Sequence, residues 1–276
     1  MTPARFHCAP PSPREAPGLD EHLALCREAE RHGIDSVVVG FDLAGPDPFA
    51  WAAALGRRAK AVRFLLACRP GVSSPTYWAQ QVNTLAAVLG GRVGVLVGAE
   101  WEPGQQLAYG DATSREEWYT RLDEFWQVCH GLWEGSEPVR LTGRHYRIDG
   151  ATINARFVSG DTRHRPEIYV RGPLGPSLAF AGRHADCVLV GPDEPAAVRA
   201  VLDAGVRAGL VVPMNGSAGD VAATIGRHRA AGVTDFFVPG ERLRTFGEEV
   251  LPLVRADERS GASRAAGLVR RGGAGR

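Results

Sequence analysis

Residues 63–97, RFLLACRPGVSSPTYWAQQVNTLAAVLGGRVGVLV, decide the fold class. The stretch has a short apolar run at each end, and such runs are typical of buried strands. Between them, Ser74 and Pro75 precede a segment of small and apolar residues over 76–89. Serine caps the first turn of a helix and proline is tolerated there, so this segment is predicted to be helical. Strand, helix and strand in this order predict a βαβ unit of a parallel sheet.

The same alternation continues on both sides of this unit. We expect the other barrel strands at Arg5–Cys8, Ser36–Gly40, Glu167–Arg171, Cys187–Val190, Leu210–Pro213 and Asp235–Val238. We expect the other helices at 19–32, 48–59, 114–134, 176–182, 196–208, 219–231 and 244–255. Eight strands, each followed by a helix, predict an α/β fold of the (β/α)8 TIM barrel type. An open doubly wound sheet accommodates the same alternation and stays as the alternative.

Two features modify this simple barrel. Residues 138–153 alternate around turn signals, which predicts a β-hairpin inserted after the fourth helix. The seventh strand leads almost directly into the helix that starts near Gly219, so the region around this strand is short. We expect one domain over residues 1–256, followed by a disordered tail over 257–276, which is rich in Gly, Ala and Arg.

Composition excludes several classes of function. The chain has 32 basic and 31 acidic residues, so no overall field favours nucleic acid or an anionic membrane. No apolar run approaches the roughly 18 residues of a membrane span, and no secretory leader is evident. The five cysteines lie far apart, which is typical of reduced thiols, and the eight histidines lack metal-ligand spacing. We therefore expect a cytoplasmic protein without a metal, a nucleic-acid partner or a membrane partner.

Candidate catalytic residues lie where the strands end, because active sites of such barrels gather at the C-terminal ends of the strands. These candidates are His7, Cys68, Arg69 and Glu100. Each has a structural alternative: a strand-end histidine, a small buried thiol, or a solvated loop charge. No familiar catalytic, phosphate-binding or dinucleotide-binding motif accompanies them.

Several longer motifs go beyond a generic barrel. RPGVSSPT (69–76) is followed by a helix rich in small residues and by Gly-Arg before the next strand. LDEFWQVCHGLWEG (122–135), RLTGRHYRIDGA (140–151) and EIYVRGPLGPSLAFAGRHADCVLVGPDEP (167–195) follow. In content and order these motifs resemble the luciferase-like flavin monooxygenase superfamily. The resemblance covers roughly residues 30–255 and is closest to the branch of FMNH2-dependent alkanesulfonate monooxygenases.

This resemblance implies a flavin-dependent monooxygenase with two components. A separate reductase supplies FMNH2, and the barrel uses it with O2 to oxygenate a small or medium organic substrate. The resemblance also implies a homodimer, formed by the helices after the second and third strands, with a heterodimer as the alternative.

The same resemblance implies a set of cofactor-binding residues. The flavin phosphate is expected on the loop and helix start after the fifth strand, where backbone N–H groups attract an anion. The isoalloxazine ring is expected against the ends of the third and fourth strands. The residues so implied are Ala67, Cys68, Gly98, Tyr119, Arg171, Gly172, Leu174, Gly175 and Ser177.

The chain also departs from the family pattern. The short region around the seventh strand removes much of the lid of full-length relatives. That strand, within LVVPMN (210–215), lacks the arginine and histidine of the sulfonate branch, and Pro173 has no N–H to offer a phosphate. Alkanesulfonate is therefore disfavoured as the substrate. Two alternatives stay open: a non-catalytic flavin-binding or structural subunit, and a deazaflavin-dependent oxidoreductase of the same fold.

Overall fold

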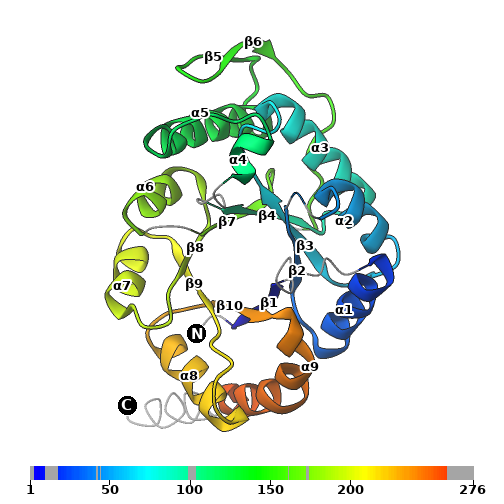
Figure 1. The fold of residues 1–276 in the computed structure, drawn as a ribbon, viewed down its shortest axis with the longest axis vertical. Coiled ribbons are helices and arrows are strands. Elements are labelled where there is room, and N and C mark those ends of the chain that lie inside the picture. Colours follow the sequence, from blue (N-terminus) through cyan, green and yellow to red (C-terminus); the bar gives the residue numbers. More distant parts are fainter. Residues whose placement is uncertain are drawn as a thin grey trace, which may run out of the picture.

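A closed ring of parallel strands forms the centre of the molecule. The computed structural model describes residues 3–9, 18–41, 43, 45–98, 104–160, 162–171 and 174–259. Within these residues the strand order is β1-β10-β9-β8-β7-β4-β3-β2, and the barrel closes because β1 pairs with β10. Figure 1 shows the strands as an inner ring with the helices packed around the outside. The (β/α)8 prediction is confirmed, and the open doubly wound sheet is excluded.

The barrel strands begin and end close to the predicted positions. They are β1 (Arg5–Ala9), β2 (Ser36–Val39), β3 (Arg63–Cys68), β4 (Val93–Gly98), β7 (Glu167–Arg171), β8 (Cys187–Val190), β9 (Arg207–Val211) and β10 (Asp235–Pro239). The seventh strand of the barrel, β9, is the exception, since it begins three residues before the predicted Leu210. The preceding helix ends early because Gly205 adopts a left-handed φ of 73°. Arg207 is therefore a barrel residue rather than the end of a helix.

The helices follow the strands as expected. They are α1 (Leu19–His32), α2 (Pro48–Gly56), α3 (Pro75–Val88), α4 (Gln105–Ala108), α5 (Arg115–Glu134), α6 (Leu174–His184), α7 (Pro195–Asp203), α8 (Ala218–Ala230) and α9 (Leu243–Thr245). The Ser74 hydroxyl accepts a hydrogen bond from the N–H of Tyr77 at 3.3 Å, so the predicted cap of α3 is present.

The C-terminal end of the described chain is helical beyond the predicted domain boundary. A 3₁₀ turn (η2, Gly240–Arg242) precedes α9, and a π-helical turn (η3, Phe246–Val250) follows it. Residues 251–259 continue as helix, and Glu258 pairs with Arg229 of α8 at 2.8 Å. The first three residues of the expected tail therefore belong to this helix, and the rest of the expected tail lies outside the described residues.

The predicted insertion is a two-stranded hairpin, β5 (Val139–Thr142) and β6 (Arg147–Ala151). It is fastened to α5 because the Glu124 carboxylate accepts three backbone N–H bonds of 2.7 to 3.0 Å from residues 144–146. A Cβ at Gly143 would overlap this carboxylate, so the turn requires a glycine. Figure 1 places the hairpin outside the ring of helices, beside α5. It braces α5 from outside the barrel.

The core consists of two shells separated by the strands. One large cluster packs between strands and helices, and a second, smaller cluster fills the barrel interior. The interior cluster, here called the lumen cluster, comprises Val38, Leu65, Tyr169, Cys187, Leu189 and Phe237. Because successive side chains of a strand point to opposite faces, these positions define which residues of each strand face the lumen.

Candidate functional site

The C-terminal end of the lumen, here called the mouth, is lined by small residues. On five strands, the next side chain toward the C-terminal end on the lumen face is easily identified, because it follows the preceding lumen-facing residue by two positions. These side chains are Ala9, Ala67, Gly98, Arg171 and Pro239. All five are at least partly exposed, unlike the buried lumen cluster beneath them. Four of these residues are short and uncharged, so among the described residues little side-chain volume stands above the packed floor. Arg171 contributes the positive charge.

One edge of the mouth gathers hydroxyl groups at the start of α6. The Tyr119 hydroxyl of α5 lies 3.3 Å from the hydroxyl of Ser177, which is fully buried in the first turns of α6. Arg171 ends β7 immediately before this helix and is exposed. The structure thus brings Tyr119 and Ser177 together near the start of α6 at Leu174 and Gly175, and the phosphate-binding role of these residues stays a prediction. Gly172 lies outside the described residues.

Ala67 and Cys68 face opposite sides of β3. Ala67 follows the alternation of Leu65 toward the lumen, whereas Cys68 packs in the outer shell against helices. Burial raises the pKa of the Cys68 thiol well above its ordinary value, so it is neutral at physiological pH. The side chain of Cys68 therefore does not face the mouth, and its selection as a catalytic or ring-contacting thiol was wrong. Ala67 is the residue placed to contact a ligand.

The loops at the mouth are held together by Arg121 of α5, which the sequence analysis missed. Its guanidinium donates to both carboxylate oxygens of Asp111, at 2.7 and 2.5 Å, and to the carbonyl of Pro70 at 3.1 Å. A Cβ at Gly71, whose φ is 104°, would lie within 2.8 Å of this guanidinium. Arg121 thus ties the loop after β3 to the loop after β4. Arg69 begins the first of these loops and is partly exposed.

Asp111 is ionised because of this contact. Burial alone would raise the pKa of its carboxyl, but the hydrogen bond from Arg121 and those from Thr113 lower it to about 2. The ion pair is largely shielded from water, since both side chains are buried. It fixes the geometry of the mouth on the side of β3 and β4. Glu100, the acidic candidate predicted after β4, lies outside the described residues.

His7 lies at the opposite end of the lumen from the mouth. Its Nδ1 is 2.6 Å from the Ser36 hydroxyl and its Nε2 is 3.0 Å from the Asp235 carboxylate. Ser36 and Asp235 are the first residues of β2 and β10, so this imidazole belongs to the N-terminal half of the barrel. Its predicted position at the mouth was wrong, because the stagger between neighbouring strands sets the level of each side chain.

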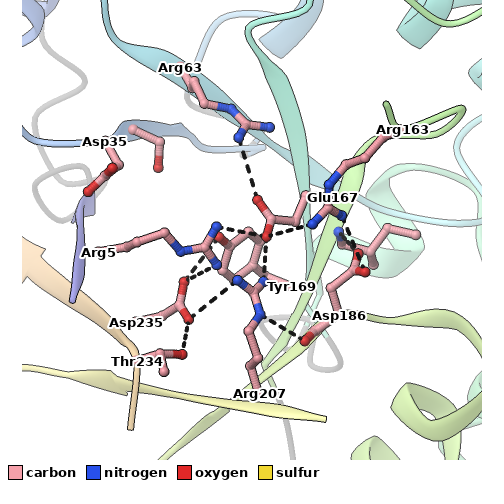
Figure 2. A network of polar contacts seen from close by, with 12 residues as sticks. Arg5, Asp35, Arg63, Arg163, Glu167, Tyr169, Asp186, Arg207, Thr234 and Asp235 are labelled. Atoms are coloured by element: carbon pink, nitrogen blue, oxygen red, sulfur yellow. Dashed lines mark hydrogen bonds and ion pairs between the residues drawn. The ribbon is translucent and has the colours of Figure 1, made fainter. Parts of the chain in front are cut away.

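Charged residues close this N-terminal end of the lumen. Figure 2 shows the Glu167 carboxylate among guanidinium groups: Arg5 donates to it at 2.9 Å, Arg207 also donates to it, and Arg63 lies 3.6 Å away. Asp235, fully buried, accepts from Arg5 at 2.5 Å. These residues, here called the charged plug, come from strands spread around the whole ring. In such barrels this end serves stability, and the other end carries the chemistry.

Burial alone would raise the pKa of Asp235, but its contacts reverse the effect. The hydrogen bond from His7 and the charge of Arg5 hold the pKa of this carboxyl below its ordinary value. Asp235 is therefore ionised inside the barrel. The His7 imidazole thus contacts Ser36 and Asp235, and Asp235 also pairs with Arg5.

The comparison with family models identifies the family to which this barrel belongs. The chain matches the luciferase-like monooxygenase model over residues 1–230 and therefore belongs to that family. Membership confirms the predicted superfamily and the predicted class of enzyme, an oxidoreductase or monooxygenase. No helix in the described ranges has the length and apolar character needed to cross a bilayer.

Solved structures with the same fold include proteins that bind different cofactors. Riboflavin lyase (RcaE), solved with modified FMN and riboflavin, has a TM-score of 0.79 and 15% identity, with 93% of this chain and 92% of that chain covered. Monooxygenase RslO1 from Streptomyces bottropensis has a TM-score of 0.71 and 20% identity, with 90% and 99% covered. An F420-dependent secondary alcohol dehydrogenase, solved with an F420-acetone adduct, has a TM-score of 0.72 and 18% identity, with 92% of this chain and 99% of that chain covered. At these identities the likeness shows the fold alone.

Proposed function

We propose that the protein binds reduced FMN at the mouth and uses it with O2 to oxygenate a small or medium organic molecule. The observation that carries this proposal is a floor of small residues with a helix start at its edge, where backbone N–H groups attract an anion. In the same proposal, a separate reductase supplies the FMNH2 and the protein acts as a homodimer.

The floor of the mouth fits a flat ring. Among the residues that the structure describes, nothing lies within 4 Å of a Cβ placed at Gly98. Ala67, on the neighbouring strand, adds only a methyl group facing the same space. A bulky or charged side chain at either position would occupy the volume that an isoalloxazine needs. The small residues are thus suited to a planar aromatic ligand.

The edge of the mouth fits a phosphate. The start of α6 offers the N–H groups of Leu174 and Gly175, while Pro176 lacks one. Arg171 adds an exposed cation, and the Tyr119 hydroxyl, which lies against the buried Ser177, adds a donor. A helix of this length also carries a partial positive charge at its N-terminus. These groups would hold the phosphate of FMN.

The chain's own residues position and shield the cofactor. Bound reduced FMN would supply the electrons that activate O2 for transfer of one oxygen atom to the substrate. Arg171 and Tyr119 would fix the phosphate, and Ala67 and Gly98 would let the ring approach the backbone. Arg121 keeps the two loops beside β3 and β4 together, which limits the entry of water on that side.

Anaerobic titration with FMNH2, followed by mixing with O2, tests this function. We expect saturable binding and a reoxidation of the bound flavin that is much slower than that of free FMNH2. Arg171→Gln should weaken binding because it removes the cation beside α6, and Arg140→Gln, on the exposed hairpin, serves as the matched control.

The other outcomes of this titration would each contradict the proposal in a distinct way. Binding of F420 in place of FMNH2 would establish a deazaflavin-dependent oxidoreductase. Binding of FMNH2 that reoxidises as fast as the free flavin would favour the non-catalytic subunit. That outcome would agree with the short connection of residues 212–217 between β9 and α8, which leaves this side of the mouth without a long loop.

A further inference from the structure

A group of metal-ligating side chains lies on the outer surface of the barrel. Among the residues that the structure describes, one set of three histidine, cysteine or carboxylate side chains has its ligand atoms close enough to share an ion. Its members are Glu28, His32 and Glu248, whose ligand atoms all lie within 4.8 Å of one another. Glu28 and His32 belong to the end of α1, and Glu248 belongs to the π-helical turn η3. Figure 1 shows α1 beside α9, the helix that leads into η3, outside the ring of strands.

The geometry of α1 brings the first two of these side chains together. Residues four apart lie on the same face of a helix, and Nε2 of His32 is 2.8 Å from Oε1 of Glu28. Because α1 ends at His32 and β2 begins at Ser36, this pair lies at the N-terminal end of the barrel, opposite the mouth. The C-terminal end of a helix carries a partial negative charge, which favours a cation at this position.

The imidazole of His32 is held in place by the C-terminal part of the chain. A Cβ at Gly247 would overlap this ring, so the ring rests against the backbone of η3. Arg255, farther along the same helical segment, donates to the backbone carbonyl of His32 at 3.0 Å. π-Helical turns are rare and are frequently found at functional sites. The ring nitrogen is thus directed at Glu28 before any ion arrives, which lowers the entropic cost of binding.

The two oxygens of the buried Glu28 carboxylate have different partners. Oε1 faces His32, whereas Oε2 pairs with Arg31 and lies 3.8 Å from Arg244. Burial alone would raise the pKa of this carboxyl, but the hydrogen bond from His32 and the charge of Arg31 hold it below its ordinary value. Glu28 is therefore ionised, as a metal ligand must be. The two arginine side chains are 65% and 74% exposed, so both can turn into water when an ion binds.

We propose that Glu28, His32 and Glu248 bind a zinc ion, with water completing its coordination. Zn²⁺ takes imidazole nitrogen and carboxylate oxygen at about 2.0 to 2.2 Å, so such ligands lie roughly 3.3 to 3.6 Å apart in a tetrahedron. The contact between Glu28 and His32 would widen slightly, and the exposed Glu248 would rotate inward. The ion would replace the proton that Glu28 and His32 share.

A zinc ion at this site would fasten α1 to the C-terminal helical segment. The expectation of a protein without a metal rested on the spacing of the histidines. That spacing cannot detect a site with one histidine, whose third ligand lies near the other end of the chain.

Calorimetric titration of the untagged full chain with Zn²⁺ tests this site. We expect saturable binding that Glu248→Gln weakens by roughly tenfold or more, since the loss of even an outer-shell contact costs about 10- to 100-fold in affinity. Glu249→Gln, which is exposed on the same turn, is the matched control and should retain the affinity of the unchanged chain. His32→Asn should abolish binding. Arg31→Gln should strengthen it, because a cation that competes for Glu28 is removed.

Thermal unfolding supplies a second readout. Zn²⁺ should raise the Tm of the unchanged chain and of Glu249→Gln but not that of Glu248→Gln, because the ion binds the folded state. The two glutamate variants keep the test decisive if His32→Asn folds poorly, since both positions are exposed. Equal Zn²⁺ affinity in these two variants would overturn the proposal, as would the absence of saturable binding. Mg²⁺ that binds as tightly as Zn²⁺ would show an acidic patch without an imidazole ligand and would also overturn it.

Discussion

The two ends of the barrel are built by the same strands but use their side chains in opposite ways. At the N-terminal end, long charged residues such as Arg5, Glu167 and Asp235 reach across the lumen and link strands that are distant in sequence. At the mouth, Ala67 and Gly98 place almost no side chain in the lumen, as far as the described residues extend. Stability favours a lumen filled with interacting side chains, whereas binding needs space for a ligand. Because every second residue of a strand faces the lumen, the same strand can carry a long side chain at one end and a small one at the other.

The largest expected effect is at the charged plug. Glu167→Gln removes the carboxylate that several arginines share, and loss of one partner of a buried ion pair costs about 3–5 kcal/mol. We expect about 3 kcal/mol here, since the arginines keep some contact with water. Urea denaturation measures the free energy of unfolding. The control is Asp149→Asn, whose exposed pair with Arg140 should contribute nothing measurable. Equal losses in the two variants would refute the structural role of the plug.

Two glycines of β4 sharpen the comparison within one strand. A Cβ at Gly94 would lie 2.6 Å from Cδ2 of Leu65 in the lumen cluster, whereas a Cβ at Gly98 meets nothing. Overpacking of a core costs about 1–3 kcal/mol, so Gly94→Ala should lower the free energy of unfolding by that amount. Gly98→Ala should change it by less than about 0.5 kcal/mol. If Gly98→Ala destabilises as much as Gly94→Ala, the mouth is not open above β4.

The pH dependence of the free energy of unfolding should reveal the contribution of the ion pair between Asp111 and Arg121 at the mouth. The pKa of Asp111 is about 2 in the folded chain against an ordinary 3.8, so its charge stabilises the fold above about pH 4. This stabilisation is lost as the pH falls from about 4 towards 2, because the unfolded chain takes up the proton first. Asp111→Asn should therefore flatten the pH dependence of the free energy of unfolding in that window. An unchanged slope would show that Arg121 does not hold this carboxylate ionised.

The smallest expected effect is at the edge of the mouth. Tyr119→Phe removes a hydroxyl whose contact with Ser177 is long, so stability should hardly change. If the phosphate of FMN lies there, binding should weaken by only about threefold to tenfold, as expected for one hydrogen bond. Fluorescence titration with FMN measures this change. Tyr77→Phe, on the exposed face of α3, is the matched control and should bind as the unchanged chain does.

Much of this architecture could be predicted from the sequence because local signals were strong. The apolar runs and the Ser74 cap located β3 and α3 to within one residue. The start of β9 was missed because Arg207 interrupts the apolar pattern, although an arginine suits the charged plug. The orientation of Cys68 was available from strand alternation, since Leu65 and Ala67 occupy the other face.

The parts of the site that could not be predicted depend on contacts between distant segments. Arg121 meets Pro70, which lies 51 positions earlier, and no spacing in the sequence marks that pair. The level of His7 depends on its register with Ser36 of β2, which no local pattern sets. Tyr119 and Ser177 could be paired only through the family resemblance, because they lie on separate helices.

The pairing of Arg5 with Asp235 joins residues 230 positions apart, within the two strands that close the ring. Synthesis proceeds from the N-terminus, so β1 leaves the ribosome long before its neighbour β10 exists. Until then, β1 has one open edge and Arg5 lacks the carboxylates of both Glu167 and Asp235. Closure of the barrel consequently comes late in folding and is slow, because it pairs strands that are far apart in the sequence. Until then, the unpaired edge of β1 must be protected from aggregation.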